Sequence, residues 1–148
     1  MSKRPARPAN TPWMMAYLTV RDSDKAMDFY EKAFGFTRGI ALPGPNGKTG
    51  HAEMHWKDAR IMFSPEGFNG CPAKCPTTSG QVSPMNLYFY VEDVDAAFKR
   101  AVAAGAQVVG QLTDMFWGDS IAAVKDPDGY IWSMATNVAE CDFSKMPK

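Results

Sequence analysis

The sequence predicts an α+β fold built from two βαβββ modules, because one pattern of elements occurs twice, about seventy residues apart. The stretch Tyr17–Val20 matches Tyr88–Val91, and Asp22–Asp24 matches Asp93–Asp95. In both copies the acidic pair precedes a stretch with helical character. The identities are few, and their shared offset is what indicates a repeat.

Each module begins with a strand that runs into a helix. We predict helices over Lys25–Phe34 and Ala96–Ala104. Acidic residues precede both stretches, and they suit the positive end of a helix dipole. Gly35 and Gly105 stand near the C-terminal ends of the two helices, where glycine is common.

Short, alternating strands bounded by turns complete each module. The turn Trp56–Ala59 lies over Asp126–Gly129, and Ile61–Phe63 then lies over Ile131–Ser133. We interpret Asp126–Gly129 as a structural turn in which glycine adopts a positive φ. A module this small leaves one apolar sheet face uncovered, so two modules are expected to pair.

The repeat also predicts the domain organisation. We expect a first module over residues 13–64 and a second over 85–136. Residues 65–84 between them are rich in Gly, Pro, Cys and Ser, as linkers are. Residues 1–12 are basic and Pro-rich without a following apolar segment, which predicts a flexible arm rather than a secretory signal. Residues 137–148 form a polar C-terminal tail.

Composition argues against several classes of partner. The chain has 16 basic and 16 acidic residues, so its charge gives no reason to expect nucleic acid or an anionic membrane as a partner. No apolar run is long enough to span a bilayer. High aromatic and methionine content, with 9 Phe, 5 Tyr, 4 Trp and 10 Met, favours a cavity for an apolar or flat ligand.

Cysteine usage favours a reducing compartment. Three cysteines are an odd number, which argues against a secreted disulfide framework, so we expect a soluble cytoplasmic protein. Cys71 and Cys75 are separated by three residues rather than the two of most zinc sites, and no second Cys/His pair lies nearby. Cys141 lies in the tail and is expected to be a free thiol.

Four stretches together cover most of residues 15–136: YLTVRDSDKAMDFYEKAFGF, HAEMHWKDARIMF, LYFYVEDVDAAFKRAVAAGA and DMFWGDSIAAVKDPDGYIWSMAT. They resemble the vicinal oxygen chelate superfamily of glyoxalase I, bleomycin-resistance proteins and extradiol dioxygenases. The last two look like the small PhnB-like branch. The resemblance implies a curved mixed sheet formed by the paired modules, with helices on its outer face. It also implies a ligand site in the concavity, often completed in a homodimer.

The same resemblance implies a divalent metal held by the first and last strands of each module. The implied ligand positions are Met15, Met62, Asn86 and Trp132, with Tyr17 and Tyr88 as positions that some members use. Thioether, indole, amide and neutral phenol groups are poor ligands for such an ion. We therefore expect no metal and no other cofactor at the standard site.

The stretch HAEMH is the alternative metal site. On a strand, His51, Glu53 and His55 share one face. The outer two are about 13 Å apart along the strand, so three donors at about 2 Å from one ion cannot come from this row. A displaced divalent ion at His51 and Glu53 would need a third ligand from elsewhere in the chain.

A structural interpretation of the same stretch depends on the turn that follows it. If Lys57–Asp58 form a tight turn, Glu53 lies opposite Met62 and His55 lies opposite Arg60. Arg60 is then a diagonal neighbour of Glu53, close enough for an ion pair. His51 and Glu53 then belong either to a polar sheet face or to the polar corner of a ligand pocket.

Strand alternation collects a larger set of side chains on one concave face. Leu87 and Phe89 are expected to pack under a helix, which leaves Tyr88 and Trp132 on the open side, and the loop Phe116–Asp119 could overhang it. The predicted ligand-binding residues are Tyr17, His51, Glu53, Arg60, Met62, Asn86, Tyr88, Trp117 and Trp132. Alternatively, these aromatic residues fill the interior, or Phe116 and Trp117 anchor a dimer interface.

The leading functional hypothesis is a metal-free protein that binds a small aromatic or apolar organic molecule, to sequester an antibiotic-like compound or to sense one. The rival is a metal-dependent lyase, isomerase or dioxygenase with a displaced site near His51 and Glu53. A metal-free enzyme is a second version, with Glu53 as general base and Tyr88 or His51 as proton donor. The third hypothesis is a purely structural dimer.

Overall fold

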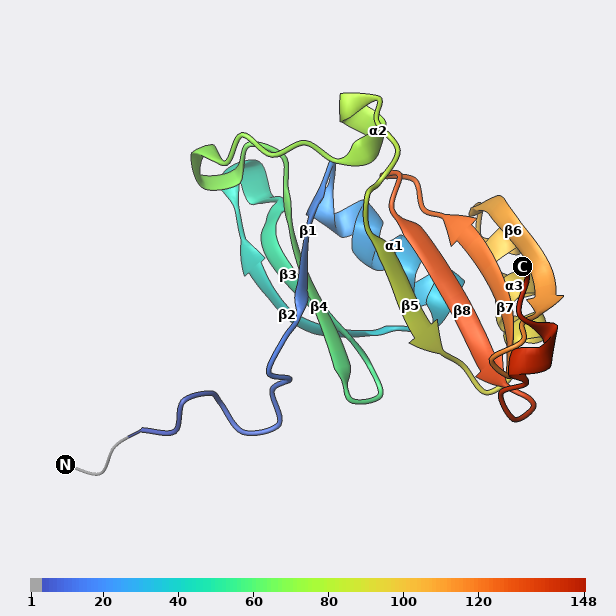
Figure 1. Cartoon of the computed structure of the whole chain (residues 1–148). Coiled ribbons are helices and arrows are strands. Elements are labelled where there is room, and N and C mark those ends of the chain that lie inside the picture. The colour runs from blue at the N-terminus through green and yellow to red at the C-terminus, as the bar shows by residue number, and fades with distance from the viewer. Residues whose placement is uncertain (1–3) are drawn as a thin grey trace. The chain divides into compact units, whose positions relative to one another are not determined.

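The computed structural model describes residues 4–148, which divide into two compact units with the same order of elements (Figure 1). The first unit comprises residues up to 31 and residues 35–73, and the second comprises 32–34 and 74–148. Residues 1–3 of the predicted arm lie outside the described residues. The predicted α+β fold with two βαβββ modules is confirmed.

The first unit contains one mixed sheet in the order β1-β4-β3-β2. Strand β1 runs parallel to β4, and the other neighbours are antiparallel. Its elements are β1 (Ala16–Val20), α1 (Ser23–Phe34), β2 (Thr37–Pro43), a 3-10 turn (Pro45–Gly47), β3 (Thr49–Trp56), β4 (Ala59–Pro65) and a second 3-10 turn (Phe68–Gly70). The last three residues of α1 are grouped with the second unit.

The second unit repeats this sheet in the order β5-β8-β7-β6, again with one parallel pair, β5 and β8. The connecting segment adds the short helix α2 (Pro76–Ser79) before the repeat begins. The other elements are β5 (Asn86–Tyr90), α3 (Val94–Ala103), β6 (Gln107–Asp114), β7 (Asp119–Lys125), β8 (Ile131–Asn137) and a 3-10 turn (Phe143–Lys145).

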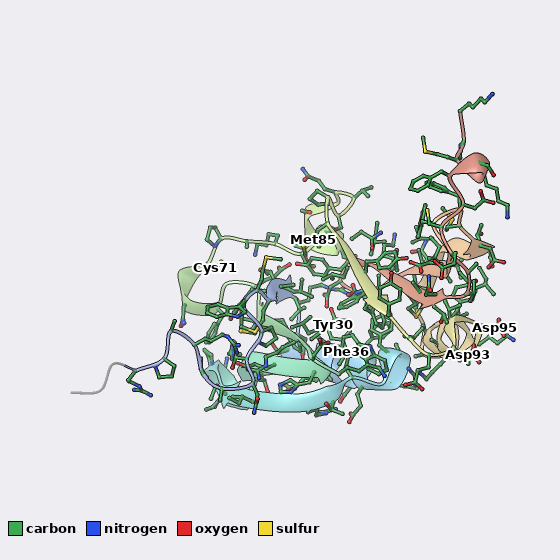
Figure 2. All side chains as sticks on the ribbon, turned by 60° about the horizontal axis from the view of Figure 1, so that its bottom comes forward. Tyr30, Phe36, Cys71, Met85, Asp93 and Asp95 are labelled. Atoms are coloured by element: carbon green, nitrogen blue, oxygen red, sulfur yellow. The ribbon has the colours of Figure 1, made fainter. Side chains whose placement is uncertain are left out.

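The two long helices start at the aspartates of the repeat. The side chain of Asp22 accepts hydrogen bonds from the backbone N–H groups of Asp24 and Lys25 in α1. Asp93, labelled beside α3 in Figure 2, accepts one from the N–H of Ala96. These groups have no partner inside a helix, so the side chains satisfy them. Helix α1 ends at Gly35, whose φ of 71° is the left-handed conformation that glycine adopts without strain.

Helix α1 covers the apolar face of its sheet. Tyr30 packs edge-on against Phe63 of β4, with ring centroids 5.7 Å apart, and lies near Phe36 (Figure 2). Leu18 and Val20 of β1 are buried on the same side of the sheet. Tyr17, which precedes Leu18, is exposed, as expected for a residue on the open face.

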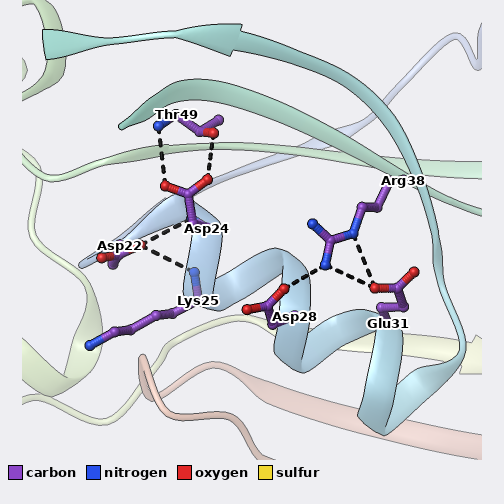
Figure 3. A network of polar contacts seen from close by, with 7 residues as sticks. All are labelled: Asp22, Asp24, Lys25, Asp28, Glu31, Arg38 and Thr49. Carbon is purple, nitrogen blue, oxygen red and sulfur yellow. Dashed lines mark hydrogen bonds and ion pairs between the residues drawn. The ribbon is translucent and has the colours of Figure 1, made fainter. Parts of the chain in front are cut away.

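Polar side chains also tie α1 to its sheet (Figure 3). Asp24 accepts hydrogen bonds from the backbone N–H and the hydroxyl of Thr49, at the start of β3. Arg38 of β2 forms ion pairs with Asp28 and Glu31 on α1. These contacts hold α1 against one face of the sheet, and the opposite face is not covered by this helix.

The core of the second unit includes Trp132, and this corrects its predicted position. Trp132 is 2% exposed, lies 4.9 Å from the ring of Phe34 and 5.9 Å from that of Phe89, and donates from Nε1 to Asp126 Oδ2 at 2.8 Å. Its strand neighbour is Leu87, which was expected on the helix side. The prediction that Trp132 lies on the open face is wrong.

The error comes from the spacing of the repeat. Tyr17 lies beside Met62 in the first sheet, and its counterpart Tyr88 lies beside Ser133 in the second. Matching Met62 to Trp132 therefore shifted the last strand by one residue. Since side chains alternate along a strand, a shift of one residue moves every side chain to the other face.

Two smaller predictions can also be compared with the structure. Asp126–Gly129 is a turn, closed by a 3.0 Å hydrogen bond between the N–H of Gly129 and the carbonyl of Asp126, and Gly129 has a φ of 93°. None of Cys71, Cys75 and Cys141 forms a disulfide, and Cys75 is buried. Within residues 4–148, none of the helices has the length and apolar character needed to cross a membrane.

Candidate functional site

The hairpin of β3 and β4 creates the open face of the first sheet. Glu53 pairs with Met62 and His55 pairs with Arg60, as predicted from a turn at Lys57–Asp58. Lys57 adopts a φ of 50°, which tightens this turn. The register places the side chains of His51, Glu53, His55 and Arg60 on the face opposite α1, while Ala52 and Met54 are buried on the other side.

These side chains form a continuous polar row. The hydroxyl of Tyr17 lies 2.9 Å from His51 Nδ1, and His51 Nε2 lies 3.7 Å from Glu53 Oε1. Arg60 Nη1 lies 3.2 Å from Glu53 Oε2, which confirms the predicted ion pair. His55 Nε2 is 4.0 Å from the same oxygen. The Glu53 side chain is only 13% exposed, so its charge is balanced mainly by Arg60 rather than by water.

The second sheet has its own open face. Asn86, Tyr88 and Tyr90 point to one side of β5, and the less exposed Leu87 and Phe89 alternate with them. Across the strand pair, these three residues face Ile131, Ser133 and Ala135 of β8. Asn86 Nδ2 donates to the hydroxyl of Ser133 at 3.0 Å.

A buried carboxylate organises the aromatic residues of this second face. Asp119, at the start of β7, is 3% exposed. Its Oδ2 accepts hydrogen bonds from the hydroxyls of Tyr88 at 2.7 Å and Tyr90 at 2.9 Å, and from the indole N–H of Trp117 at 3.2 Å. Its Oδ1 accepts from Asn137 Nδ2 at 3.0 Å. We call Asp119, Tyr88, Tyr90 and Trp117 the aromatic cluster.

The cluster shifts the acidities of its members. Burial raises the pKa of Asp119, but hydrogen bonds from Asn137, the two tyrosines and Trp117 outweigh burial and leave this pKa below its usual value. Burial and the hydrogen bond to Asp119 raise the pKa of Tyr88 to about 12. The hydrogen bond to Asp119, with burial, also raises the pKa of Tyr90. At neutral pH the carboxylate is therefore ionised and both phenols keep their protons.

Sequence reasoning did not select Asp119 as a site residue. The signal was present, because Asp119 ends the D-M-F-W-G-D run that contains Trp117. Its role depends on the register of β7 and β8, which pairs Asp119 with Asn137 and Ala123 with Ser133. That register puts Asp119 on the same face as Tyr88, and the shifted repeat obscured this.

The residues at the implied metal positions do not fit a divalent ion. Correcting the register replaces Trp132 by Ser133, so the positions become Met15, Met62, Asn86 and Ser133. Thioether, amide and hydroxyl groups are weak ligands for hard or borderline ions, and Asn86 and Ser133 hydrogen-bond each other. Within residues 4–148, no three His, Cys, Asp or Glu side chains are grouped closely enough to hold a metal.

Comparison with known proteins gives the family. The model of the Glyoxalase/Bleomycin resistance protein/Dioxygenase superfamily matches residues 12–134. The uncharacterized protein Mb0911c of Mycobacterium bovis is 38% identical over 136 residues, which cover 91% of this chain and 90% of that protein. The crystal structure of TioX from Micromonospora sp. ML1 aligns with a TM-score of 0.68 and 29% identity, covering 84% of this chain and 98% of TioX.

A family enzyme from Burkholderia phytofirmans PsJN has the same fold, with a TM-score of 0.65 at 19% identity over 84% of this chain and 97% of that one. The matched region includes both βαβββ modules and therefore both open faces. The chain belongs to the glyoxalase/bleomycin resistance protein/dioxygenase superfamily.

Proposed function

We propose that this protein binds a small aromatic or apolar organic molecule on the open faces of its sheets, and that it does so without a divalent metal. The aromatic cluster is the observation that carries the proposal. Tyr88, Tyr90 and Trp117 are 44%, 55% and 38% exposed, yet all three polar ends are fixed on one oxygen of Asp119. Ring surface, rather than polar groups, is what these side chains present to a ligand.

Fixed rings favour binding for an entropic reason. Ordering a side chain when a ligand binds costs about 0.5–1.5 kcal/mol for each rotamer-rich side chain. In the cluster this ordering has already taken place on folding, because each ring is held at its far end. Tyrosine and tryptophan also offer large flat contact areas at low entropic cost, which suits stacking with a planar ligand.

Small neighbours allow this arrangement. Strand β8 separates β5 from β7 in the sheet, so the two tyrosines must reach across it to meet Asp119. The β8 residues beside them on that face are Ser133 and Ala135. Large side chains at these two positions would hold the rings away from the carboxylate.

The polar row of the first sheet supports recognition of the polar groups of a ligand. Tyr17 is half exposed, and its hydroxyl is oriented by His51. Glu53 and Arg60 offer an acceptor and a donor that already neutralise each other. A ligand that binds on this face therefore contacts polar groups that are already fixed. Its binding does not remove water from an unpaired charge of the protein, which would be costly.

The metal-free enzyme is the second candidate. What favours it is that His51 lies between two groups that can exchange protons, with the hydroxyl of Tyr17 at 2.9 Å from Nδ1 and Glu53 Oε1 at 3.7 Å from Nε2. Two contacts weigh against the predicted roles. Glu53 already forms an ion pair with Arg60, and the hydroxyl of Tyr88 already donates a hydrogen bond to Asp119. Replacing Glu53 by Gln separates the candidates, since an enzyme loses turnover while it keeps substrate binding, and a binding protein has no turnover to lose.

The test of the proposal is a thermal-shift screen of neutral fused-ring compounds, followed by calorimetric titration of the best compound. We expect saturable binding that Tyr90→Ala weakens about tenfold, equivalent to about 1.4 kcal/mol, because a stacking surface is removed. Phe143→Ala is the matched control, since Phe143 is an exposed aromatic residue of the tail and not of the sheet. Equal losses in both variants, or no binding by any compound, would contradict the proposal.

A further inference from the structure

We propose that the N-terminal arm and the β3–β4 hairpin together form an oxyanion-binding pocket, distinct from the aromatic cluster. A cavity of about 480 Å³ lies between them in the first unit. The arm contributes Arg7 and residues 10–13, and the hairpin contributes His55 and residues 57–60. Its volume falls in the range of small-molecule sites. In Figure 1 the arm is the coil that leads into β1.

Buried nitrogens without a hydrogen-bond partner are concentrated on residues that line this pocket. Among residues 4–148, four buried side-chain nitrogen or oxygen atoms have no hydrogen-bond partner, and three of them belong to residues that line this one cavity. They are Arg7 Nε, Arg60 Nε and His55 Nε2. Buried polar groups without partners are uncommon and unfavourable, so three around one cavity call for an explanation.

The chemistry of arginine fixes the nature of the partner. An Nε–H group can only donate, and a guanidinium keeps its charge at any ordinary pH. The groups that complete Arg7 and Arg60 must therefore be acceptors. Oxygens of a carboxylate or a phosphate are the acceptors that arginine binds most strongly, because they are charged and match its planar geometry.

Both guanidinium groups are already held in place by their other nitrogens. Arg7 donates from Nη1 to the carbonyl of Thr11, and its guanidinium lies 4.7 Å from the centre of the Trp13 ring. Arg60 pairs with Glu53 through Nη1 and donates from Nη2 to the carbonyl of Asn10 at 3.4 Å. The last contact joins the hairpin to the arm. Neither Nε–H group is used by these contacts, so both still lack an acceptor.

The charge around the cavity also favours an anion. Arg7, Lys57 and Arg60 are its basic lining residues, against a single acidic one, Asp58. Even with Glu53 counted as the partner of Arg60, positive charge exceeds negative charge by one. A small oxyanion would neutralise this excess. The exposed ring of Trp13 borders the same space, so an aromatic acid is expected to bind more tightly than an inorganic ion.

This inference does not depend on the proposed function, because Arg7 belongs neither to the aromatic cluster nor to the polar row, although Arg60 and His55 line both the pocket and the row. The experiment is a titration of the untagged full chain with inorganic phosphate, and separately with benzoate, at constant ionic strength kept with sodium chloride. The readout is the set of arginine Nε–H signals in proton–nitrogen NMR spectra. We expect saturable shifts of the Arg7 and Arg60 signals, with benzoate binding more tightly than phosphate.

Charge-conserving variants supply the controls. Arg7→Lys keeps the positive charge and removes the Nε–H group, so the apparent affinity for both anions should fall at least tenfold. Arg4→Lys is the matched control, since Arg4 is exposed on the same arm and does not line the cavity, and its affinity should not change. Phosphate alone binding would identify an inorganic oxyanion as the ligand class, and tighter benzoate binding would identify an organic acid.

Two results would overturn the inference. One is a set of signal shifts that rise linearly with anion concentration without saturation. The other is an equal loss of affinity in the Arg4 and Arg7 variants, which would mean a general charge effect. The neutral fused-ring compound should bind Arg7→Lys and wild type equally. The anion titration therefore tests the oxyanion pocket alone, and binding of the fused-ring compound tests the proposed function alone.

Discussion

The hydroxyl of Tyr88 donates a 2.7 Å hydrogen bond to Oδ2 of Asp119, and this contact joins two strands that are not neighbours in their sheet. Tyr90 donates to the same oxygen at 2.9 Å. A single buried carboxylate thereby fixes two rings that would otherwise rotate freely on a sheet surface. The chemistry of Asp119 controls whether this face is ordered, and several predictions depend on it.

The first prediction concerns the titration of the tyrosines. Among the five tyrosines, Tyr88 should ionise at about pH 12, because burial and the hydrogen bond to Asp119 both disfavour the phenolate. Its pKa is raised on folding, so its stabilising contribution is present below pH 10 and is lost as the pH rises from 10 to about 12. Absorbance at alkaline pH measures this phase. Tyr88→Phe should remove it, and a phase that persists in this variant would refute the assignment.

The second prediction concerns the stability that Asp119 provides. Asp119→Ala should lower the free energy of unfolding by about 2–4 kcal/mol, because four donors lose a charged acceptor. Asp119→Asn should cost about 1–2 kcal/mol, since one oxygen remains. Urea denaturation at pH 7 measures both variants. Asp114→Asn, at an exposed position, should stay within about 0.5 kcal/mol of wild type.

Because the Asp119 carboxylate can be protonated, the difference in the free energy of unfolding between wild type and Asp119→Asn should depend on pH. The pKa of Asp119 is lowered on folding, so its contribution is fully present above 3.8, the usual pKa, and is lost as the pH falls through the lower, folded value. The stability difference between the two proteins should therefore shrink in acid. A constant difference from pH 7 down to pH 3 would contradict the role assigned to ionised Asp119.

Much of the fold could be predicted because the repeat, the helix ends and the hairpin turn are local signals. The pairing of Glu53 with Arg60 followed from a two-residue turn and strand alternation alone. Trp132 could not be placed in this way. The face on which it lies depends on the register of β8 against β5, and the two copies of the repeat share too few identical residues to fix that register. Asp119 was missed since its partners come from β5, from the preceding loop and from the end of β8, and no local pattern joins these segments.

The third prediction uses two glycines at the same place in the repeat, Gly39 in β2 and Gly110 in β6. A Cβ atom on Gly39 would lie 2.6 Å from His55 Nε2 and 3.1 Å from the carbonyl oxygen of Glu53. A Cβ on Gly110 would meet Ala123 Cβ at an ordinary 3.5 Å. Gly39→Ala should therefore lower the free energy of unfolding by about 1–3 kcal/mol, and Gly110→Ala should be neutral or stabilising by up to about 1 kcal/mol.

Denaturation of the two glycine variants in parallel measures this difference. Gly39→Ala should also shift the NMR signals of the His55 ring, because the ring has to move away from the new methyl group. Equal stabilities of the two variants would contradict the prediction, because they would mean that β2 and His55 move apart at little cost to admit the methyl group. The comparison is matched, since both substitutions place the same methyl group on an edge strand.

The fourth prediction separates the two tryptophans of the second unit. Trp132→Phe should destabilise the protein by about 1–3 kcal/mol, because the buried Oδ2 of Asp126 loses the indole N–H as a donor. It should leave the affinity for a fused-ring ligand unchanged. Trp117→Phe should do the reverse. Its effect on stability should be small because Asp119 Oδ2 keeps the hydroxyls of Tyr88 and Tyr90 as donors, and binding should weaken because Trp117 is exposed at the aromatic cluster. Calorimetric titration below the melting temperature measures affinity, and weaker binding in Trp132→Phe would contradict its placement in the core.

The fifth prediction is that the protein takes up no stoichiometric divalent metal. The donors at Met15, Met62, Asn86 and Ser133 are weak, and Arg60 lies 3.2 Å from Glu53, where its positive charge repels a cation. Elemental analysis of untagged protein purified without chelator, followed by calorimetric titration with nickel, zinc, manganese and iron(II), measures uptake. The double variant His51→Ala/Glu53→Ala is the control for a displaced site. Near-stoichiometric metal that this variant loses would overturn the metal-free proposal and favour the metal-dependent enzyme. Metal bound equally by both proteins would instead place the ion away from the polar row, and exposed Cys71 would be the next ligand to replace.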